Sequence, residues 1–185
     1  MTLRLPTIHG ITDLGEGREE LQLEFSNGEH RVYRRQRARG NGAVVIVAVS
    51  EPGVVLLTRE YACGLHRYEL GLPRGRIDDG ETPLQAANRE LKEEVGFGAR
   101  RLQVLRTLSL VPSYMDHVTH LVLAHDLYPE RLAGDEPEPL EVLPWRLDAL
   151  DQLMLCDEFS EGRALAALFI AREWLAHNPD AGSDA

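Results

Sequence analysis

Short hydrophobic runs alternate with polar turns along most of the chain, a pattern that predicts intermixed strands and helices in an α/β fold. Residues 43–50 form an uninterrupted valine-rich run, which is typical of a strand buried on both faces. A second strand is predicted at residues 54–59, after the turn at residues 51–53. The other predicted elements are strands at 68–72, 102–110 and 117–125 and helices at 147–155 and 160–177, the last offering Leu165, Leu168, Phe169 and Trp174 to the core.

The beginning of the chain has the pattern of a small antiparallel β unit. Residues 21–25 alternate in polarity, Asn27-Gly28 is a hairpin turn signal, and residues 30–34 resume extended character. A polar, arginine-rich bridge follows, so we divide the chain into an N-terminal β unit at 1–42 and a main domain at 43–185. Such a short unit has too little core to be stable alone. It is expected to pack either on its own chain or on a partner subunit.

The most informative local pattern lies at residues 75–97, GRIDDGETPLQAANRELKEEVGF, called the signature segment below. Thr82 is a natural helix N-cap, Pro83 suits the first helical position, and Gln85 completes a capping box with Thr82. Gly96 supplies a left-handed residue after the last turn. A helix is therefore predicted between Thr82 and Gly96, with Leu84, Ala87, Leu91 and Val95 facing inward.

Three carboxylates, Glu90, Glu93 and Glu94, share one flank of this predicted helix. Spacings of three and four residues bring side chains together, so like charges there destabilise the helix. Arg89 can relieve Glu93 but leaves Glu90 facing Glu94. A hard divalent cation would remove the conflict, because clustered carboxylate oxygens are the ligands that Mg²⁺ or Mn²⁺ prefers. For these glutamates taken alone, a solvated acidic helix face is the alternative interpretation.

The full spacing of the signature segment favours a metal site. Gly75, Glu81, Arg89-Glu90-Leu91, Glu93-Glu94 and Gly96-Phe97 are separated by five, seven, one and one residues, which is the complete Nudix motif. The chain resembles the Nudix hydrolases on these residues. The resemblance implies an α/β/α sandwich around a mixed central sheet. It also implies hydrolysis of a nucleoside diphosphate linked to another group, with Mg²⁺ or Mn²⁺ and water.

The resemblance also assigns roles within the signature segment. It implies that Glu90, Glu93 and Glu94 are the principal metal ligands, with Glu93 and Glu94 central to catalysis. Arg89 would orient the carboxylates, and Gly75 would offer a backbone carbonyl to the metal. Because every carboxylate of the motif is present, an enzyme is favoured over a Nudix module that binds ADP-ribose or NAD without cleaving it.

Two positions after the signature segment bear on the substrate. Pro112 lies fifteen residues after Phe97, as in ADP-ribose hydrolases of the family, and Tyr114 lies seventeen after it, as in dinucleoside polyphosphate hydrolases. Residues 72–75, Leu-Pro-Arg-Gly, are more similar to the corresponding segment of generic ADP-sugar hydrolases. The resemblance thus implies ADP-ribose, NADH or diadenosine polyphosphates as substrates, with AMP released. It also implies a homodimer in which the N-terminal strands complete the partner's pocket. Other nucleotides and capped RNA ends are the alternative substrates.

Residues outside the signature segment supply further candidates. Arg59 ends a predicted strand, and its guanidinium can bind a substrate phosphate through two hydrogen bonds; a surface salt bridge is the alternative. Glu69 is a further candidate substrate contact. Residues 134–139, GDEPEP, form an acidic loop. In-line attack on phosphorus benefits from a positioned base, and Glu136, slightly ahead of Glu138, is the candidate for this role. A plain acidic linker is the alternative.

Composition narrows the classes of function. With 185 residues, 43% of them hydrophobic, the chain can build one domain with a substantial core. Thirty acidic against twenty basic residues give a net charge of −10, which disfavours strong binding to nucleic acid or to an anionic membrane. The longest apolar run, residues 43–49, is too short to span a bilayer. Residues 1–10 lack a signal-peptide pattern, and Cys63 and Cys156 stand far apart, so a reducing cytoplasmic location is expected.

Overall fold

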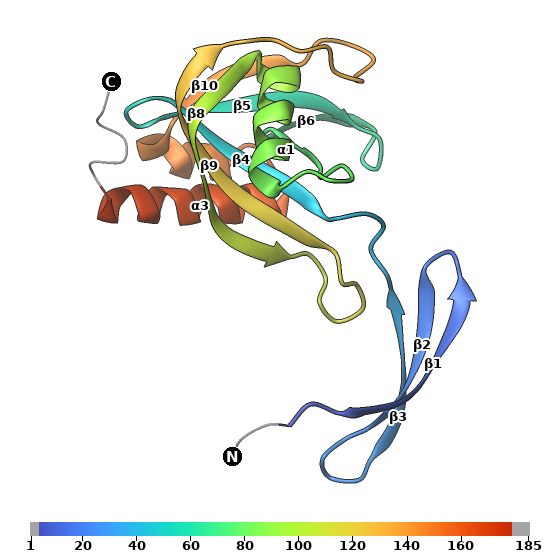
Figure 1. The fold of residues 1–185 in the computed structure, drawn as a ribbon. Coiled ribbons are helices and arrows are strands. Elements are labelled where there is room, and N and C mark those ends of the chain that lie inside the picture. The colour runs from blue at the N-terminus through green and yellow to red at the C-terminus, as the bar shows by residue number, and fades with distance from the viewer. Residues whose placement is uncertain (1–3, 179–185) are drawn as a thin grey trace.

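A mixed sheet of seven strands, covered by helices on both faces, forms the main body of the protein in the computed structural model, which describes residues 4–178 (Figure 1). The strand order is β10-β5-β4-β9-β8, with β6 paired to β5 and β7 paired to β4. Strands β4 and β9 run parallel, whereas the other pairs are antiparallel. The strands are β4 (Ala43–Glu51), β5 (Val54–Ala62), β6 (Arg67–Gly71), β7 (Arg74–Arg76), β8 (Phe97–Ser109), β9 (Val118–Pro129) and β10 (Glu141–Arg146).

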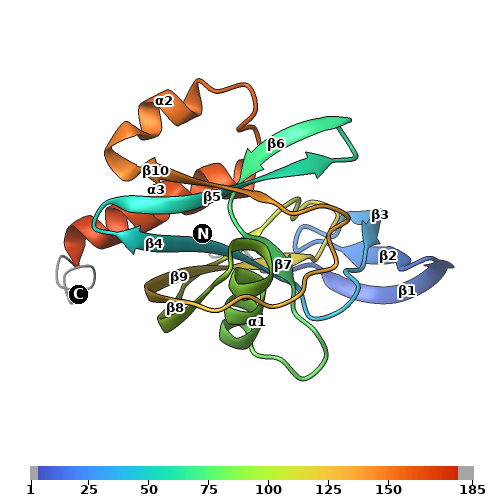
Figure 2. The ribbon, with the colours of Figure 1, turned by 90° about the horizontal axis from the view of Figure 1, so that it is seen from above.

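Helices cover both faces of this sheet, which confirms the predicted α/β/α sandwich. Helix α1 (Pro83–Glu90) lies on one face, and α3 (Gly162–His177) lies on the other (Figure 2). A π-helical turn, η1 (Leu91–Val95), continues α1. The short helices η2 (Leu147–Ala149) and α2 (Leu150–Met154) replace the single helix predicted at 147–155.

Strand β4 explains why the core has two halves. Val45, Val47 and Val49 pack into a cluster with α3, while the alternate residues of the strand pack into a second cluster with α1. Successive side chains on a strand point to opposite faces. The uninterrupted apolar run at 43–50 is therefore what a strand covered on both faces requires.

Two predicted core positions are wrong. Leu84 is 36% exposed, and Ala86 is buried in the first turns of α1 instead. The stripe through Ala86, Ala87 and Leu91 brings this helix close to the sheet, and Leu84 lies outside that contact. Phe169 is 42% exposed, and the Arg172 guanidinium stacks on its ring at 4.8 Å. Leu168 beside it is fully buried, as predicted.

The N-terminal strands form a separate three-stranded antiparallel sheet that stands off one end of the main body (Figure 1). Its strands are β1 (Thr7–Gly15), β2 (Arg18–Glu24) and β3 (His30–Gln36). The hairpin predicted at Asn27-Gly28 joins β2 and β3, with Gly28 at φ 83°. Strand β1 was not predicted, because its residues are almost all exposed and carry little periodic signal. The outermost residues of the two predicted units, 1–3 and 179–185, lie outside the described residues.

A few polar contacts attach this sheet to the main body. The backbone amide of Gln36 donates to the Tyr114 carbonyl at 2.7 Å, and the backbone amide of Ala38 donates to Asp116 Oδ1 at 2.5 Å. Arg37 pairs with the same Asp116 carboxylate at 3.0 Å. Leu21 is the one buried apolar residue of the sheet among those described. In residues 4–178, no helix is both long and apolar enough to cross a membrane.

Candidate active site

A cavity of about 790 Å³ opens beside the signature segment and collects charged side chains from several elements. The predicted metal ligands Glu90, Glu93 and Glu94 line it together with Glu136 of the acidic loop. Four carboxylates that are up to 46 residues apart in the sequence therefore share one cavity. The other charged lining residues are Glu60, Arg74, Arg76, Asp78, Arg89, Asp135, Glu161 and Arg163.

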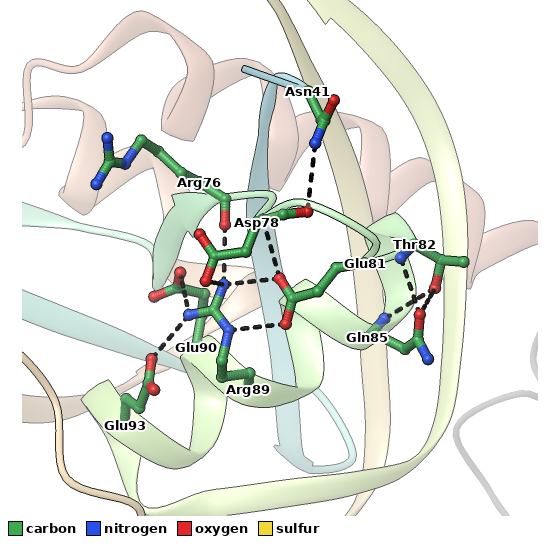
Figure 3. Close-up of polar contacts among 9 residues, drawn as sticks. All are labelled: Asn41, Arg76, Asp78, Glu81, Thr82, Gln85, Arg89, Glu90 and Glu93. Carbon is green, nitrogen blue, oxygen red and sulfur yellow. Dashed lines mark hydrogen bonds and ion pairs between the residues drawn. The ribbon is translucent and has the colours of Figure 1, made fainter. Parts of the chain in front are cut away.

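The helix that carries the carboxylates begins as predicted. Thr82 Oγ1 accepts a hydrogen bond from the Gln85 amide at 3.3 Å, and Gln85 Oε1 accepts one from the Thr82 amide at 2.9 Å (Figure 3). This capping box satisfies backbone donors that the first helical turn leaves free. Pro83 occupies the first helical position, where its missing N–H costs nothing.

The end of the helix differs from the predicted regular α-helix. Residues Leu91–Val95 form a π-helical turn, closed by a hydrogen bond from the Gly96 amide to the Leu91 carbonyl at 3.0 Å. Single π turns inside helices are uncommon and often occur at functional sites. Gly96 has φ 83°, the left-handed conformation predicted for it. The wider turn carries Glu93 and Glu94, so their relative position is not that of an ideal α-helix.

Arg89 organises the signature segment. Its guanidinium binds both carboxylate oxygens of Glu81 at 2.9 Å, Glu90 at 2.7 Å and Glu93 at 2.9 Å (Figure 3). It also donates to the Arg76 carbonyl at 2.9 Å. The bidentate pair with Arg89 lowers the pKa of Glu81, and these acceptors raise the pKa of Arg89. The predicted orienting role of Arg89 therefore has a geometric basis: it ties the loop before the helix to two of the three carboxylates.

Burial disfavours the charged forms of Glu90 and Glu94. These two residues are only 8% and 6% exposed. Burial raises the pKa of Glu94 to about 9, and the nearby Glu90 adds to this shift. Burial likewise raises the pKa of Glu90 to about 7, although Arg89 opposes that shift. The Arg74 amide donates to Glu94 at 3.2 Å, which only partly compensates the lost hydration.

Gly75 is required by the close approach of Glu90. A Cβ atom at position 75 would lie 1.9 Å from Glu90 Oε1 and 2.0 Å from its carboxylate carbon. Any larger residue would therefore displace this carboxylate from the backbone. Gly75 lies in strand β7 without a positive φ, whereas Gly80 has φ 85° and makes the turn before the helix.

The acidic loop separates its two candidate bases. Glu136 lines the cavity, and its Oε2 lies 2.1 Å from where a Cβ on Gly134 would be. Glu138 instead accepts a hydrogen bond from the Tyr68 hydroxyl at 2.5 Å, on β6. The geometry thus places Glu136, and not Glu138, beside the carboxylates of the signature segment.

Arg59 and Glu69 do not line the cavity. Strand β5 continues to Ala62, so Arg59 lies inside the strand, where its guanidinium pairs with Glu141 and Glu158. Because neighbouring side chains on a strand alternate, the next residue, Glu60, reaches the cavity instead. Glu69 accepts hydrogen bonds from Ser160 Oγ at 2.9 Å and from Arg67 at 2.5 Å.

Pro112 and Tyr114 also lie away from the cavity of their own chain. Both belong to the turn between β8 and β9, and Tyr114 is 51% exposed. The backbone carbonyl of Tyr114 receives the Gln36 amide at the junction with the N-terminal sheet. These two predicted substrate residues are therefore close to the N-terminal sheet of the same chain.

Sequence reasoning found Arg89 but missed the other basic side chains of the cavity, those of Arg74, Arg76 and Arg163. Arg74 pairs with Glu60 at 2.6 Å, and Arg163 pairs with Glu161 at 2.8 Å and donates to Thr119 Oγ1 at 3.3 Å. The side chain of Arg76 has no hydrogen bond or ion pair within the described chain. One signal in the sequence could have found two of them. Arg74 and Arg76 flank Gly75 at the start of the signature segment, and residues two apart on a strand point to the same face.

Comparison with known protein families shows which family this chain belongs to. The NUDIX domain family matches residues 39–169 of the chain. The chain belongs to the Nudix hydrolase family. A second family, described as the NudE-type Nudix hydrolase N-terminal domain, matches residues 6–35 of this Nudix hydrolase. That match covers most of the three-stranded N-terminal sheet.

The similarity extends to whole relatives of this Nudix hydrolase. It is 48% identical to the ADP compounds hydrolase NudE of Escherichia coli K12, over 94% of this chain and 95% of that protein. It is 28% identical to an ADP-ribose pyrophosphatase of Bacillus subtilis, over 79% of each protein. A crystal structure of an ADP compounds hydrolase superposes with a TM-score of 0.86 at 46% identity, covering 96% of this chain and 98% of that one.

Nudix hydrolases generally need a divalent metal ion, and the donor set here fits one. Within residues 4–178, no three acidic, histidine or cysteine side chains already converge as ligands. Glu90 and Glu93 each accept a hydrogen bond from Arg89 through one oxygen. Each keeps a second oxygen that no hydrogen bond of the described chain occupies. The buried Glu90 and Glu94, whose pKa values burial raises, and the free oxygens of Glu90 and Glu93 are groups that a hard cation would bind.

Replacing Glu94 with Gln should separate function from stability. In the unfolded chain this carboxyl ionises near pH 4.5, whereas burial raises its pKa in the folded protein to about 9. The folded protein therefore binds more protons between these values and loses stability as the pH rises through that range. We expect metal-free Glu94→Gln at pH 8 to melt at least about 3 °C above the wild type, while turnover falls at least a hundredfold, roughly 3 kcal/mol in the barrier.

Thermal unfolding in a chelator, from pH 5 to pH 9, measures the first effect, and metal-saturated kinetics measure the second. Glu51→Gln, an exposed change at the far end of β4, is the matched control and should alter neither. A metal-free Glu94→Gln protein that melts below the wild type at pH 8, or that keeps near-normal turnover, would contradict this assignment.

Proposed function

We propose that this Nudix hydrolase cleaves the pyrophosphate linkage of ADP compounds and releases AMP, using Mg²⁺ or Mn²⁺. Candidate substrates are ADP-ribose, NADH and diadenosine polyphosphates. The observation that carries the proposal is similarity along nearly the whole chain, N-terminal sheet included, to a protein named ADP compounds hydrolase. The intact set Glu90, Glu93 and Glu94 beside one cavity supports catalysis over mere binding.

The charges of the cavity suit a pyrophosphate once a cation is present. Glu90, Glu93, Glu94 and the Gly75 carbonyl are the groups proposed to hold the metal. When bound, the cation neutralises phosphate oxygens and makes water a better nucleophile. Arg76 has no acidic partner in the described chain, so its guanidinium can bind a substrate phosphate without breaking an ion pair.

Glu136 is the proposed general base for the attacking water. It lies in the cavity yet outside the carboxylates proposed to hold metal, so an oxygen remains available to accept a proton. Its neighbour Glu138 is engaged by Tyr68. The acidic loop follows β9 and precedes β10, and its residues 134–137 line the same cavity as the signature segment.

A homodimer is proposed because the N-terminal sheet exposes one apolar face. Cross-strand partners Ile11, Leu21 and Tyr33 lie on the same face, and Ile11 and Tyr33 are 52% and 49% exposed. A second copy of the chain can cover this face. Four predicted substrate contacts do not line the cavity of their own chain. We keep them as proposed contacts of the assembled dimer: Arg59, Glu69, Pro112 and Tyr114. A cytoplasmic location is also proposed, consistent with the free thiols of Cys63 and Cys156.

The substrate proposal is tested with a panel of ADP-ribose, NADH, diadenosine triphosphate, GDP-mannose and ATP, each with Mg²⁺ and with Mn²⁺. We expect AMP as a product from the first three, because the adenosine diphosphate part is common to them. Chromatographic identification of products is the measurement. Rapid cleavage of GDP-mannose or ATP, with no AMP from the three ADP compounds, would overturn the proposed specificity.

The base proposal predicts different effects for two isosteric changes in the acidic loop. Glu136→Gln should lower kcat at least a hundredfold with little change in metal affinity, because it removes the proton acceptor and leaves the metal ligands intact. Glu138→Gln should lower kcat much less. Kinetics at saturating substrate and metal, repeated across pH, distinguish the two. Wild-type kcat in both single variants and the double variant would place the base in the signature segment.

The dimer proposal predicts that a charge on the apolar face of the N-terminal sheet disrupts assembly. Ile11→Glu should yield a monomer with a raised KM, because burying an unpaired carboxylate at the interface is costly. Light scattering and kinetics measure both. Leu155→Glu, at an 85% exposed position of the main body, is the matched control and should stay dimeric. A wild-type protein that is monomeric and fully active would refute the proposal.

A further inference from the structure

The acidic loop is anchored firmly at both ends. Before it, the Leu132 amide donates to the Lys92 carbonyl at 3.1 Å, and Arg131 donates to the Glu93 and Val95 carbonyls at 3.3 Å. The chain leaving β9 is therefore tied to the π turn that carries two of the metal-site carboxylates. After the loop, Glu141 starts β10, which pairs with β5.

Between these ends, one contact holds the loop. For residues 133–140 of the described chain, the hydrogen bond from the Tyr68 hydroxyl to Glu138 is the single hydrogen bond or ion pair to another element. The donor and acceptor oxygens are 2.5 Å apart. No regular secondary structure stabilises these residues. The position of the loop over the cavity thus depends on Tyr68.

We propose that Tyr68 is a positioning residue, whose hydroxyl holds Glu138 so that Glu136, two residues earlier, stays in the cavity. The inference rests on the proposed role of Glu136 as the base. Glu138 lies between Pro137 and Pro139, whose rings restrict the backbone on both sides. A restraint on Glu138 is therefore passed to Glu136 through a stiff segment.

The Tyr68 ring is itself well held. Tyr61 is its cross-strand partner in the β5–β6 pair, with the two ring centroids 6.0 Å apart in an edge-to-face arrangement. The Tyr61 hydroxyl is bonded to His66 Nδ1 at 2.6 Å, at the turn of the same hairpin. The contact between the two rings orients the Tyr68 side chain and does not involve the Tyr61 hydroxyl, which bonds within its own hairpin. A loop that moved away would lose its hydrogen bond to Tyr68.

The test compares Tyr68→Phe with Tyr61→Phe, which removes a hydroxyl from the adjacent ring but does not touch the loop. Both are exposed positions where loss of one oxygen should leave the melting temperature unchanged. We expect Tyr68→Phe to lower kcat about tenfold at saturating metal and substrate, with KM within twofold. Tyr61→Phe should keep kcat within twofold of the wild type.

Two further measurements separate positioning from a general structural role. In a Glu136→Gln background, Tyr68→Phe should cause no further loss of kcat, because the group it positions is gone. Backbone 15N order parameters of the full-length protein should be lower at Glu136 and Glu138 in Tyr68→Phe and unchanged in Tyr61→Phe. A Tyr68→Phe effect that is equally large with Glu136→Gln, or unchanged order parameters in the loop, would overturn the inference. Lower order parameters with wild-type kcat in Glu136→Gln would instead refute the base assignment and leave the holding contact standing.

Discussion

The site depends on one interaction, the guanidinium of Arg89 bound to carboxylates on two sides of a turn. Arg89 donates hydrogen bonds to Glu81 in the loop and to Glu90 and Glu93 on the helix. A single rigid donor group thereby fixes the path from β7 to the helix and the direction of two of the side chains proposed to hold a metal. Loss of this guanidinium would leave several acidic groups unpaired at once, which is far costlier than loss of a surface ion pair.

Arg89 contacts only part of the cluster, and the carboxylate oxygens that it leaves without a partner are the ones proposed to hold a metal. Glu94 is buried out of its reach, beside Glu90, and Gly75 lets the Glu90 carboxylate lie against the backbone. Such an arrangement reduces the stability of the metal-free fold when the carboxyls ionise. The same buried oxygens are the ones proposed to hold a cation, which would offset this loss of stability.

The sequence predicts the elements with strong local signals and misses those governed by tertiary contacts. The capping box at Thr82, the left-handed Gly96 and the doubly buried β4 were all predicted correctly, because each follows from local geometry or from an uninterrupted pattern. The π turn was not predictable from helical spacing. Arg59 was placed at a strand end, whereas pairing with β6, the next strand along the chain, extends β5 to Ala62. Glu136 reached the cavity through a loop whose course only the folded chain reveals.

Proton release on metal binding tests the central claim most directly. Burial raises the pKa of Glu94 to about 9, so this carboxyl should still hold its proton at pH 7.5 in the metal-free enzyme. A divalent cation must displace that proton to bind the carboxylate. Calorimetric titration with Mg²⁺ at pH 7.5, in two buffers of different ionisation enthalpy, should therefore report release of about one proton per site. Equal heats in both buffers would show that the carboxylates were already ionised and would contradict the account.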